Sequence, residues 1–145
     1  MTALRRIQKE LSDLNNKPIP GVAIKYEDDN ILAWTVTIKG PNDSPYKGGK
    51  FILDLKFDST FPFKAPQAKF QTKIYHPGIN GEGAICIPIL KDEWKPSITI
   101  SKVLSTILEK LGNPSPDDPF NPDIAAELKE NKTKFTATAK EWTKK

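Results

Sequence analysis

Hydrophobic residues near the start of the chain recur three and four positions apart. They are Leu4, Ile7, Leu11 and Leu14. This spacing places one apolar stripe along a helix, so it predicts a helix over roughly residues 3–15. Three basic residues fall outside the stripe, Arg5, Arg6 and Lys9. They are predicted to form an exposed basic face of that helix.

The next part of the chain alternates apolar and polar residues with a period of two. Three such runs, at 22–26, 32–38 and 51–57, are separated by turn residues, and a weaker fourth run lies around 67–71. Alternation of this kind is typical of strands that bury one face. The pattern therefore predicts a four-stranded antiparallel meander.

The last third of the chain returns to helical spacing. Apolar residues between positions 103 and 111 predict a helix that Ser101 caps and Gly112 ends. Asn121 followed by Pro122 is typical of the first residues of a helix, which we expect to run to about residue 130. A last helix is predicted over roughly residues 131–143. One helix, an antiparallel sheet and then helices give the fold class α+β.

Composition and charge indicate one domain over residues 1–145 and narrow the classes of partner. The net charge is only +4, and no basic run with interleaved aromatic residues occurs, which argues against nucleic-acid binding. No apolar run approaches the ~18 residues of a membrane helix, and no signal peptide is recognisable. The expected location is therefore a reducing intracellular compartment, away from membranes.

The strongest indication of an active site is a histidine and a cysteine that each occur only once in the chain. His76 is the only histidine and Cys86 the only cysteine, and three glycines lie between them. A single cysteine excludes an intramolecular disulfide and multi-cysteine zinc sites, so we expect no metal and no cofactor. From the residues alone, Cys86 fits either a nucleophile or a small apolar residue in a buried run. His76 could activate it, as in a cysteine protease, but no third, orienting residue is identifiable.

Six motifs then occur in order along the chain. They are PFKAPQAKF, TKIYHPGIN, GAICIPILKDEW, SKVLSTIL, NPSPDDPFNPDIA and AKEWT. Together they resemble the ubiquitin-conjugating enzymes over essentially the whole chain, and most of all the members without N- or C-terminal extensions. The resemblance implies the ubiquitin-conjugating fold, in which an active-site loop follows the sheet and precedes a central helix and two C-terminal helices.

The resemblance also implies an activity. Cys86 matches the active-site cysteine, which accepts ubiquitin as a thioester from the ubiquitin-activating enzyme. Ubiquitin then passes to a substrate lysine, or first to a ligase cysteine. The implied partners are ubiquitin, the activating enzyme and a RING-type or cysteine-type ligase. The implied protein is a monomer in the cytoplasm and nucleus, within an ATP-dependent pathway.

Further positions carry over residue by residue. The activating enzyme is expected to engage Arg5, Arg6 and Lys9. The two loops that ligases contact are matched by Pro62 and Phe63 and by Pro96 and Ser97. The positions that line or buttress the catalytic groove are His76, Pro77, Gly78, Asn80, Ser115, Asp118 and Pro119.

Within that groove, the resemblance favours different roles for the polar groups. His76 is expected to hold its loop by hydrogen bonding rather than to act as a base. Asp118 is the candidate for a carboxylate near an attacking lysine, in a groove that desolvates the amine; the alternative is a turn residue bonded locally. An ordinary thiol is about 3% thiolate at pH 7, which is adequate for thioester exchange.

Two positions depart from the family pattern. Gly78 stands where most members have asparagine after His-Pro, and Pro88 stands where many have aspartate. Loss of one oxyanion donor costs on the order of 10²–10³ in rate in other acyl transfers. We therefore expect loading of Cys86 to be intact and discharge to lysine to be weak. The alternatives are a conjugating enzyme for another ubiquitin-like modifier and a poorly active ubiquitin-binding scaffold.

Overall fold

The computed structural model describes residues 3–85, 87–115 and 120–144 of the chain. In chain order the elements are α1 (Ala3–Asn16), β1 (Val22–Glu27), β2 (Asn30–Lys39), β3 (Lys50–Lys56), β4 (Gln67–Phe70), the short 3-10 helix η1 (Pro88–Leu90), α2 (Ile100–Gly112), α3 (Pro122–Glu130) and α4 (Lys132–Lys144). This order confirms the predicted α+β class. The sequence pattern gave no indication of η1.

The four strands form one antiparallel sheet in the order β1-β2-β3-β4. Adjacent strands in the sheet are thus also adjacent in the chain, as the predicted meander requires. On β2 the alternating residues Trp34, Val36 and Ile38 pair with Leu55, Leu53 and Phe51 of β3. All six side chains are buried, so the period of two does mark the face turned to the core.

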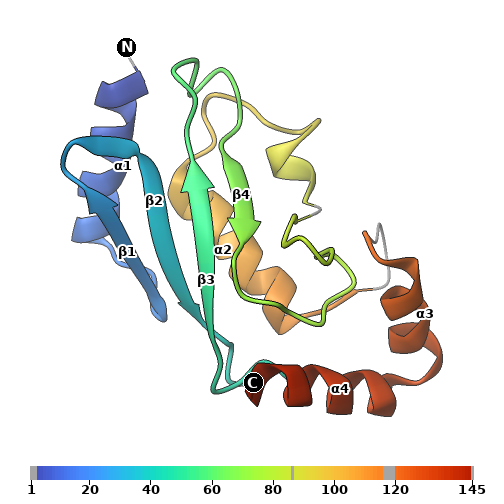
Figure 1. The fold of residues 1–145 in the computed structure, drawn as a ribbon. Coiled ribbons are helices and arrows are strands. Elements are labelled where there is room, and N and C mark those ends of the chain that lie inside the picture. The colour runs from blue at the N-terminus through green and yellow to red at the C-terminus, as the bar shows by residue number, and fades with distance from the viewer. Residues whose placement is uncertain (1–2, 86, 116–119, 145) are drawn as a thin grey trace.

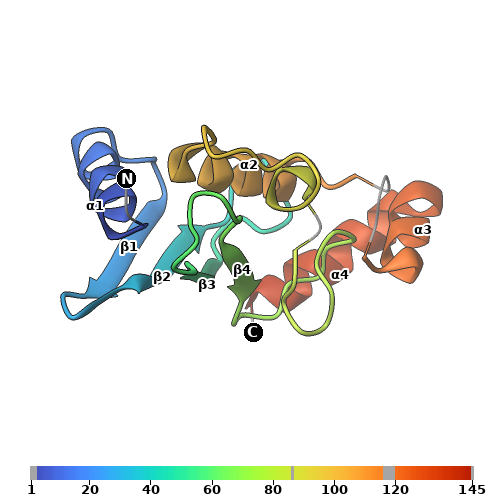
Figure 2. The same ribbon diagram turned by 90° about the horizontal axis from the view of Figure 1, so that it is seen from above.

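The helices α1 and α2 cover that face of the sheet. Their apolar residues join those of β2 and β3 in one continuous core. In Figure 1, α2 runs behind the strands, and Figure 2 shows α1 and α2 on the same side of the sheet. The helices α3 and α4 lie at the far end of the molecule from α1. A smaller apolar cluster made by Ile124, Leu128 and Phe135 holds α3 and α4 together.

The predicted start of α2 was wrong by two residues. Thr99, and not Ser101, is the N-cap, and its Oγ1 accepts a hydrogen bond from the backbone N–H of Lys102. The helix begins earlier because Ile100 is fully buried and contributes to the core from its first turn. Gly112 is the last residue of the helix rather than its terminator. The predicted cap of α3 is confirmed, since the Asn121 side chain accepts from the N–H of Ile124.

The helices of the described ranges are short. Within these ranges, none combines the length and apolar content that crossing a bilayer requires. The longest, α1, has 14 residues, whereas a membrane-spanning helix needs about 20.

Candidate functional site

A tight hairpin leads the chain into position 86. Ile79 and Ile85 face each other in an antiparallel bridge, and the N–H of Phe70 donates to the carbonyl of Gly83, which fixes the hairpin to the end of β4. Gly83 has φ of 88°, and a Cβ there would lie 2.0 Å from the Phe70 carbonyl oxygen. Only glycine satisfies both conditions.

Asn80 organises this hairpin from within. Its side-chain oxygen accepts from the backbone N–H groups of Glu82 and Ala84, at 2.9 and 3.0 Å. Its backbone carbonyl accepts from Gly83. The Asn80 side chain therefore fixes a turn. Of the two roles expected for the groove residues, lining and buttressing, this contact corresponds to buttressing.

Cys86 itself lies outside the described residues, as do Asp118 and Pro119. The isoleucines on either side of Cys86 are described, and both Ile85 and Ile87 are buried. After Ile87 the chain enters η1. Position 86 is thus bounded by two anchored residues.

His76 is buried, and both of its ring nitrogens have partners. Its Nδ1 accepts from the backbone N–H of Gly78 at 2.9 Å, so the proton of the neutral ring resides on Nε2. Nε2 lies 2.8 Å from the carbonyl oxygen of Lys110 on α2, to which it donates. Burial is the main cause that lowers the pKa of His76 to about 4. A neutral imidazole with both nitrogens occupied is suited to hold the loop and unsuited to take a proton from Cys86.

Hydrogen bonds also anchor the loop around His76 to α3 and to the segment between β2 and β3. The hydroxyl of Tyr46 donates to the carbonyl of Tyr75 at 2.6 Å, and the hydroxyl of Tyr75 donates to Glu127 at 2.8 Å. The carbonyl of Pro77 accepts from the N–H groups of Phe120 and Asn121. The loop is therefore anchored on both sides of His76.

Ser115 and Phe120, which flank positions 116–119, are both described. Phe120, just after it, is bonded to Pro77, and the ammonium of Lys91 lies 4.6 Å from the Phe120 ring centroid. Ser115, just before it, is partly buried. The structure thus brings Phe120 to the His76 loop and to Lys91, the residue that follows η1.

The low pKa of His76 makes stability depend on pH. An unfolded histidine titrates near 6.5, whereas folded His76 titrates near 4. Between these values the unfolded chain binds the proton more readily, so the free energy of unfolding falls as the pH falls. From pH 7.5 to pH 5.0 we expect a loss of about 2 kcal/mol, measured by urea denaturation.

The single histidine makes a sharp control possible. His76→Gln retains a donor and an acceptor but does not titrate. This variant should be less stable than the wild type at pH 7.5, and its loss between pH 7.5 and 5.0 should be only a few tenths of a kcal/mol. If the free energy of unfolding fell equally in both proteins, His76 would not be the group that causes the pH dependence.

The predicted ligase residues divide into exposed and buried ones. Phe63 is 77% exposed, which is unusual for a phenylalanine, and Pro96 and Ser97 are exposed as well. Pro62 is buried, and its carbonyl accepts from the indole N–H of Trp94 at 2.8 Å. Contact of a ligase with Pro62 stays a prediction, and the burial of Pro62 gives it a second role. It supports the loop from which Phe63 projects.

The basic face of α1 also needs a correction. Arg5 and Lys9 are exposed as predicted. Arg6 is directed into the protein, because its guanidinium binds Glu10 of the same helix and the carbonyl of Ile98. Helical periodicity placed Arg6 outside the apolar stripe, but it could not show that a distant loop lies beside that side chain.

Sequence reasoning also missed two residues of this region. Glu10 is a buried carboxylate on α1, and the only sequence signal was its spacing of four residues from Arg6. Trp94 joins the two predicted ligase loops, and no local signal indicated its partner. Among the described residues, no three histidine, cysteine, aspartate or glutamate side chains converge in a way that could hold a metal ion.

Comparison with known proteins agrees with this geometry. The family model described as ubiquitin-conjugating enzyme matches residues 6–143. The solved structure of the E2 domain of a Toxoplasma gondii ubiquitin conjugating enzyme is similar, with a TM-score of 0.87 and 40% sequence identity. The match covers 97% of this chain and 96% of that chain. The chain therefore belongs to the ubiquitin-conjugating enzyme family, whose members generally work with ubiquitin, an activating enzyme and a ligase.

Proposed function

We propose that this protein accepts activated ubiquitin as a thioester on Cys86 and passes it to a substrate lysine or to a ligase cysteine. The observation that carries the proposal is the state of His76. It is neutral, buried and bonded through both ring nitrogens, so it serves the loop that leads towards Cys86. A carrier needs this arrangement, because a free base next to the thioester would activate water and hydrolyse the cargo.

In the loading step, the Cys86 sulfur attacks the carbonyl carbon of the thioester on the activating enzyme. The new C–S bond forms as the old one breaks, and the departing thiol takes the proton that Cys86 releases. One thioester replaces another of similar energy, so an ordinary thiol suffices for the exchange.

In the discharge step, a lysine amine attacks the same carbonyl carbon. The C–N bond forms as the C–S bond breaks, and the departing Cys86 thiolate takes up the proton that the amide nitrogen sheds. The amine must first lose a proton, which is unfavourable at pH 7 because an ordinary lysine has a pKa of about 10.4. We propose that Asp118 helps to accept that proton. Gly78 and Pro88 supply no side-chain donor or carboxylate here, which supports the proposal that discharge to free lysine is weak.

A loading assay tests the function. The purified protein is incubated with ubiquitin-activating enzyme, ATP and ubiquitin, and separated under denaturing conditions without reductant. We expect an adduct with ubiquitin that needs ATP and disappears when a thiol reductant is added. Parallel reactions with other ubiquitin-like modifiers and their own activating enzymes should give no adduct. If only one of those modifiers formed an adduct, that modifier and not ubiquitin would be the cargo. If no modifier formed an adduct, the protein would be a ubiquitin-binding scaffold rather than a carrier.

A further inference from the structure

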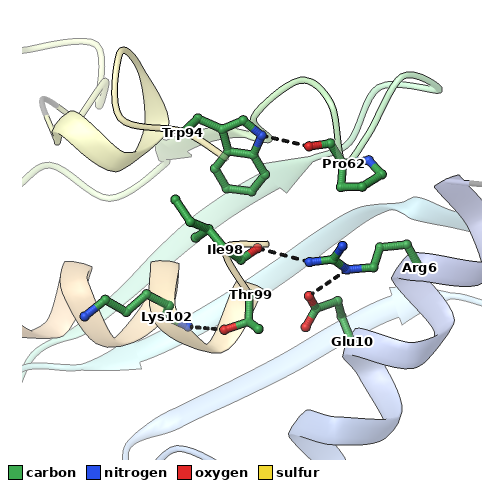
Figure 3. A network of polar contacts seen from close by, with 7 residues as sticks. All are labelled: Arg6, Glu10, Pro62, Trp94, Ile98, Thr99 and Lys102. Atoms are coloured by element: carbon green, nitrogen blue, oxygen red, sulfur yellow. Dashed lines mark hydrogen bonds and ion pairs between the residues drawn. The ribbon is translucent and has the colours of Figure 1, made fainter. Parts of the chain in front are cut away.

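The Arg6 side chain links α1 to two loops that are distant in the sequence. Its Nε lies 3.1 Å from the Glu10 carboxylate, and its Nη2 donates to the carbonyl of Ile98 at 3.2 Å. The guanidinium carbon also lies 5.8 Å from the centroid of the Phe61 ring. Figure 3 shows Arg6 between Glu10 and Ile98, with Trp94 and Pro62 next to them. One side chain thus contacts the base of both loops.

The first loop is the turn that precedes α2. The N–H of Ile98 donates to the carbonyl of Lys95 at 3.0 Å, which closes a turn with the exposed residues Pro96 and Ser97 at its tip. The carbonyl of Ile98 then accepts from Arg6. The position of this tip relative to α1 therefore depends on Arg6.

The second loop carries the exposed ring of Phe63. Two residues earlier, Phe61 is buried, and its ring packs against Phe57 and Trp94 with centroid distances of 4.9 and 6.0 Å. Trp94 adds the hydrogen bond to the Pro62 carbonyl. Since Trp94 directly precedes the Lys95–Ile98 turn, the two loops are joined at Trp94 and again at Arg6.

The chemistry of the pair explains why these residue types are used. A guanidinium is planar and donates in several directions while it stacks on a ring, which an ammonium group does not do. The Arg6 and Glu10 side chains are only 16% and 4% exposed, so each charge depends on the other. Loss of one partner leaves an uncompensated charge that tends to move into water.

We propose that Arg6 and Glu10 form a positioning pair that sets the spacing between Phe63 and the Pro96–Ser97 tip, and thereby the affinity for a RING-type ligase. The proposal rests on the proposed function. It gives α1 two separate roles, because the activating enzyme is expected to engage the exposed face with Lys9, while the Arg6–Glu10 pair acts on the ligase loops from inside.

A carboxylate-to-amide exchange at two positions of α1 tests this proposal. Glu10→Gln removes the charge that holds Arg6, and Asp13→Asn makes the same exchange at an exposed position one turn later. For each protein we would measure loading by the activating enzyme without ligase, and the KM of discharge for a RING domain chosen because it accelerates the wild type. Backbone amide shifts of Phe63 and Ser97 report on the loops directly.

We expect Glu10→Gln to raise the KM for the RING domain about tenfold, since one charge-assisted contact is lost, and to shift both amides. Loading and the maximal rate of discharge should stay within about twofold of the wild type. Asp13→Asn should change none of these. Trp94→Phe, which removes the donor to Pro62 and reduces the ring that packs on Phe61, should raise the KM as well.

An unchanged KM in Glu10→Gln, or unshifted amides, would overturn the proposal. An equal fall in loading and in ligase response would also overturn it, because the pair would then support the fold as a whole. The amide shifts need no ubiquitin. If the wild type failed to load, the proposed function would therefore fail while the coupling of the two loops could still be judged.

Discussion

Replacing Cys86 by alanine is expected to abolish formation of the reductant-sensitive ubiquitin adduct completely. Cys86 is the only cysteine of the chain, so no second thiol can accept the cargo. The substitution removes one sulfur atom and is expected to change the urea midpoint little, which separates a chemical loss from a loss of folding. The measurement is the loading assay with activating enzyme, ATP and ubiquitin.

The variant Cys86→Ser tests the same prediction more sharply. Ubiquitin can be held by three kinds of bond, and each is cleaved under different conditions. A thioester on Cys86 is cleaved by thiols. An ester on Cys86→Ser should resist thiols and be cleaved by mild alkali, and an amide on a lysine should resist both. We expect the wild type to show the first behaviour and Cys86→Ser the second, with slower loading because a hydroxyl is a weaker nucleophile than a thiol.

An adduct of the wild type that resists thiols would contradict the proposal, since it would place ubiquitin on a lysine. Retention of the adduct in Cys86→Ala would do so as well. Both outcomes leave the family membership of the chain intact. They would remove Cys86 as the carrier.

The fold could be predicted well where burial repeats along one element. Alternation identified the buried face of β2 and β3, and the apolar stripe identified α1. The start of α2 was predicted less well, because both Thr99 and Ser101 are good capping residues in isolation. Burial of Ile100 decides between them, and burial depends on the whole core.

The sequence identified residues of the candidate site but not the partners that these residues contact. The motif drew attention to His76, yet its partner Lys110 lies 34 residues away on α2. Arg6 finds Ile98 across 92 positions. Contacts over such separations arise only when the helices pack on the sheet. For the same reason, sequence could not show that Pro62 is buried while Phe63 projects.

The geometry of the His76 loop bears directly on Gly78. The N–H of Gly78 is already engaged by His76 Nδ1, so it is not available to a developing oxyanion while that bond persists. The φ of Gly78 is not among the positive values that only glycine adopts readily. A Cβ at this position would meet its nearest atoms, Cε1 and Nδ1 of His76, at 3.4 Å. The loop can therefore take an asparagine with its backbone nearly unchanged.

Gly78→Asn is accordingly expected to increase the rate of discharge to free lysine by about 10–100-fold. One oxyanion donor contributes on the order of 10²–10³ in other acyl transfers, and the tight contact with His76 should reduce that gain. The protein is first loaded with ubiquitin, the activating enzyme is then stopped, and loss of the thioester is followed after lysine is added. Loading itself should be unchanged, because thioester exchange does not depend on this donor.

Gly81→Asn is the matched control. Gly81 lies in the same stretch, its φ is also outside the positive range, and a Cβ there would meet nothing within 4 Å. It adds the same amide side chain at an exposed position of the hairpin, so its discharge rate should equal that of the wild type. An equal rate in the wild type and Gly78→Asn would show that glycine does not limit this step. An equal gain in both variants would place the effect in the hairpin rather than at the donor position.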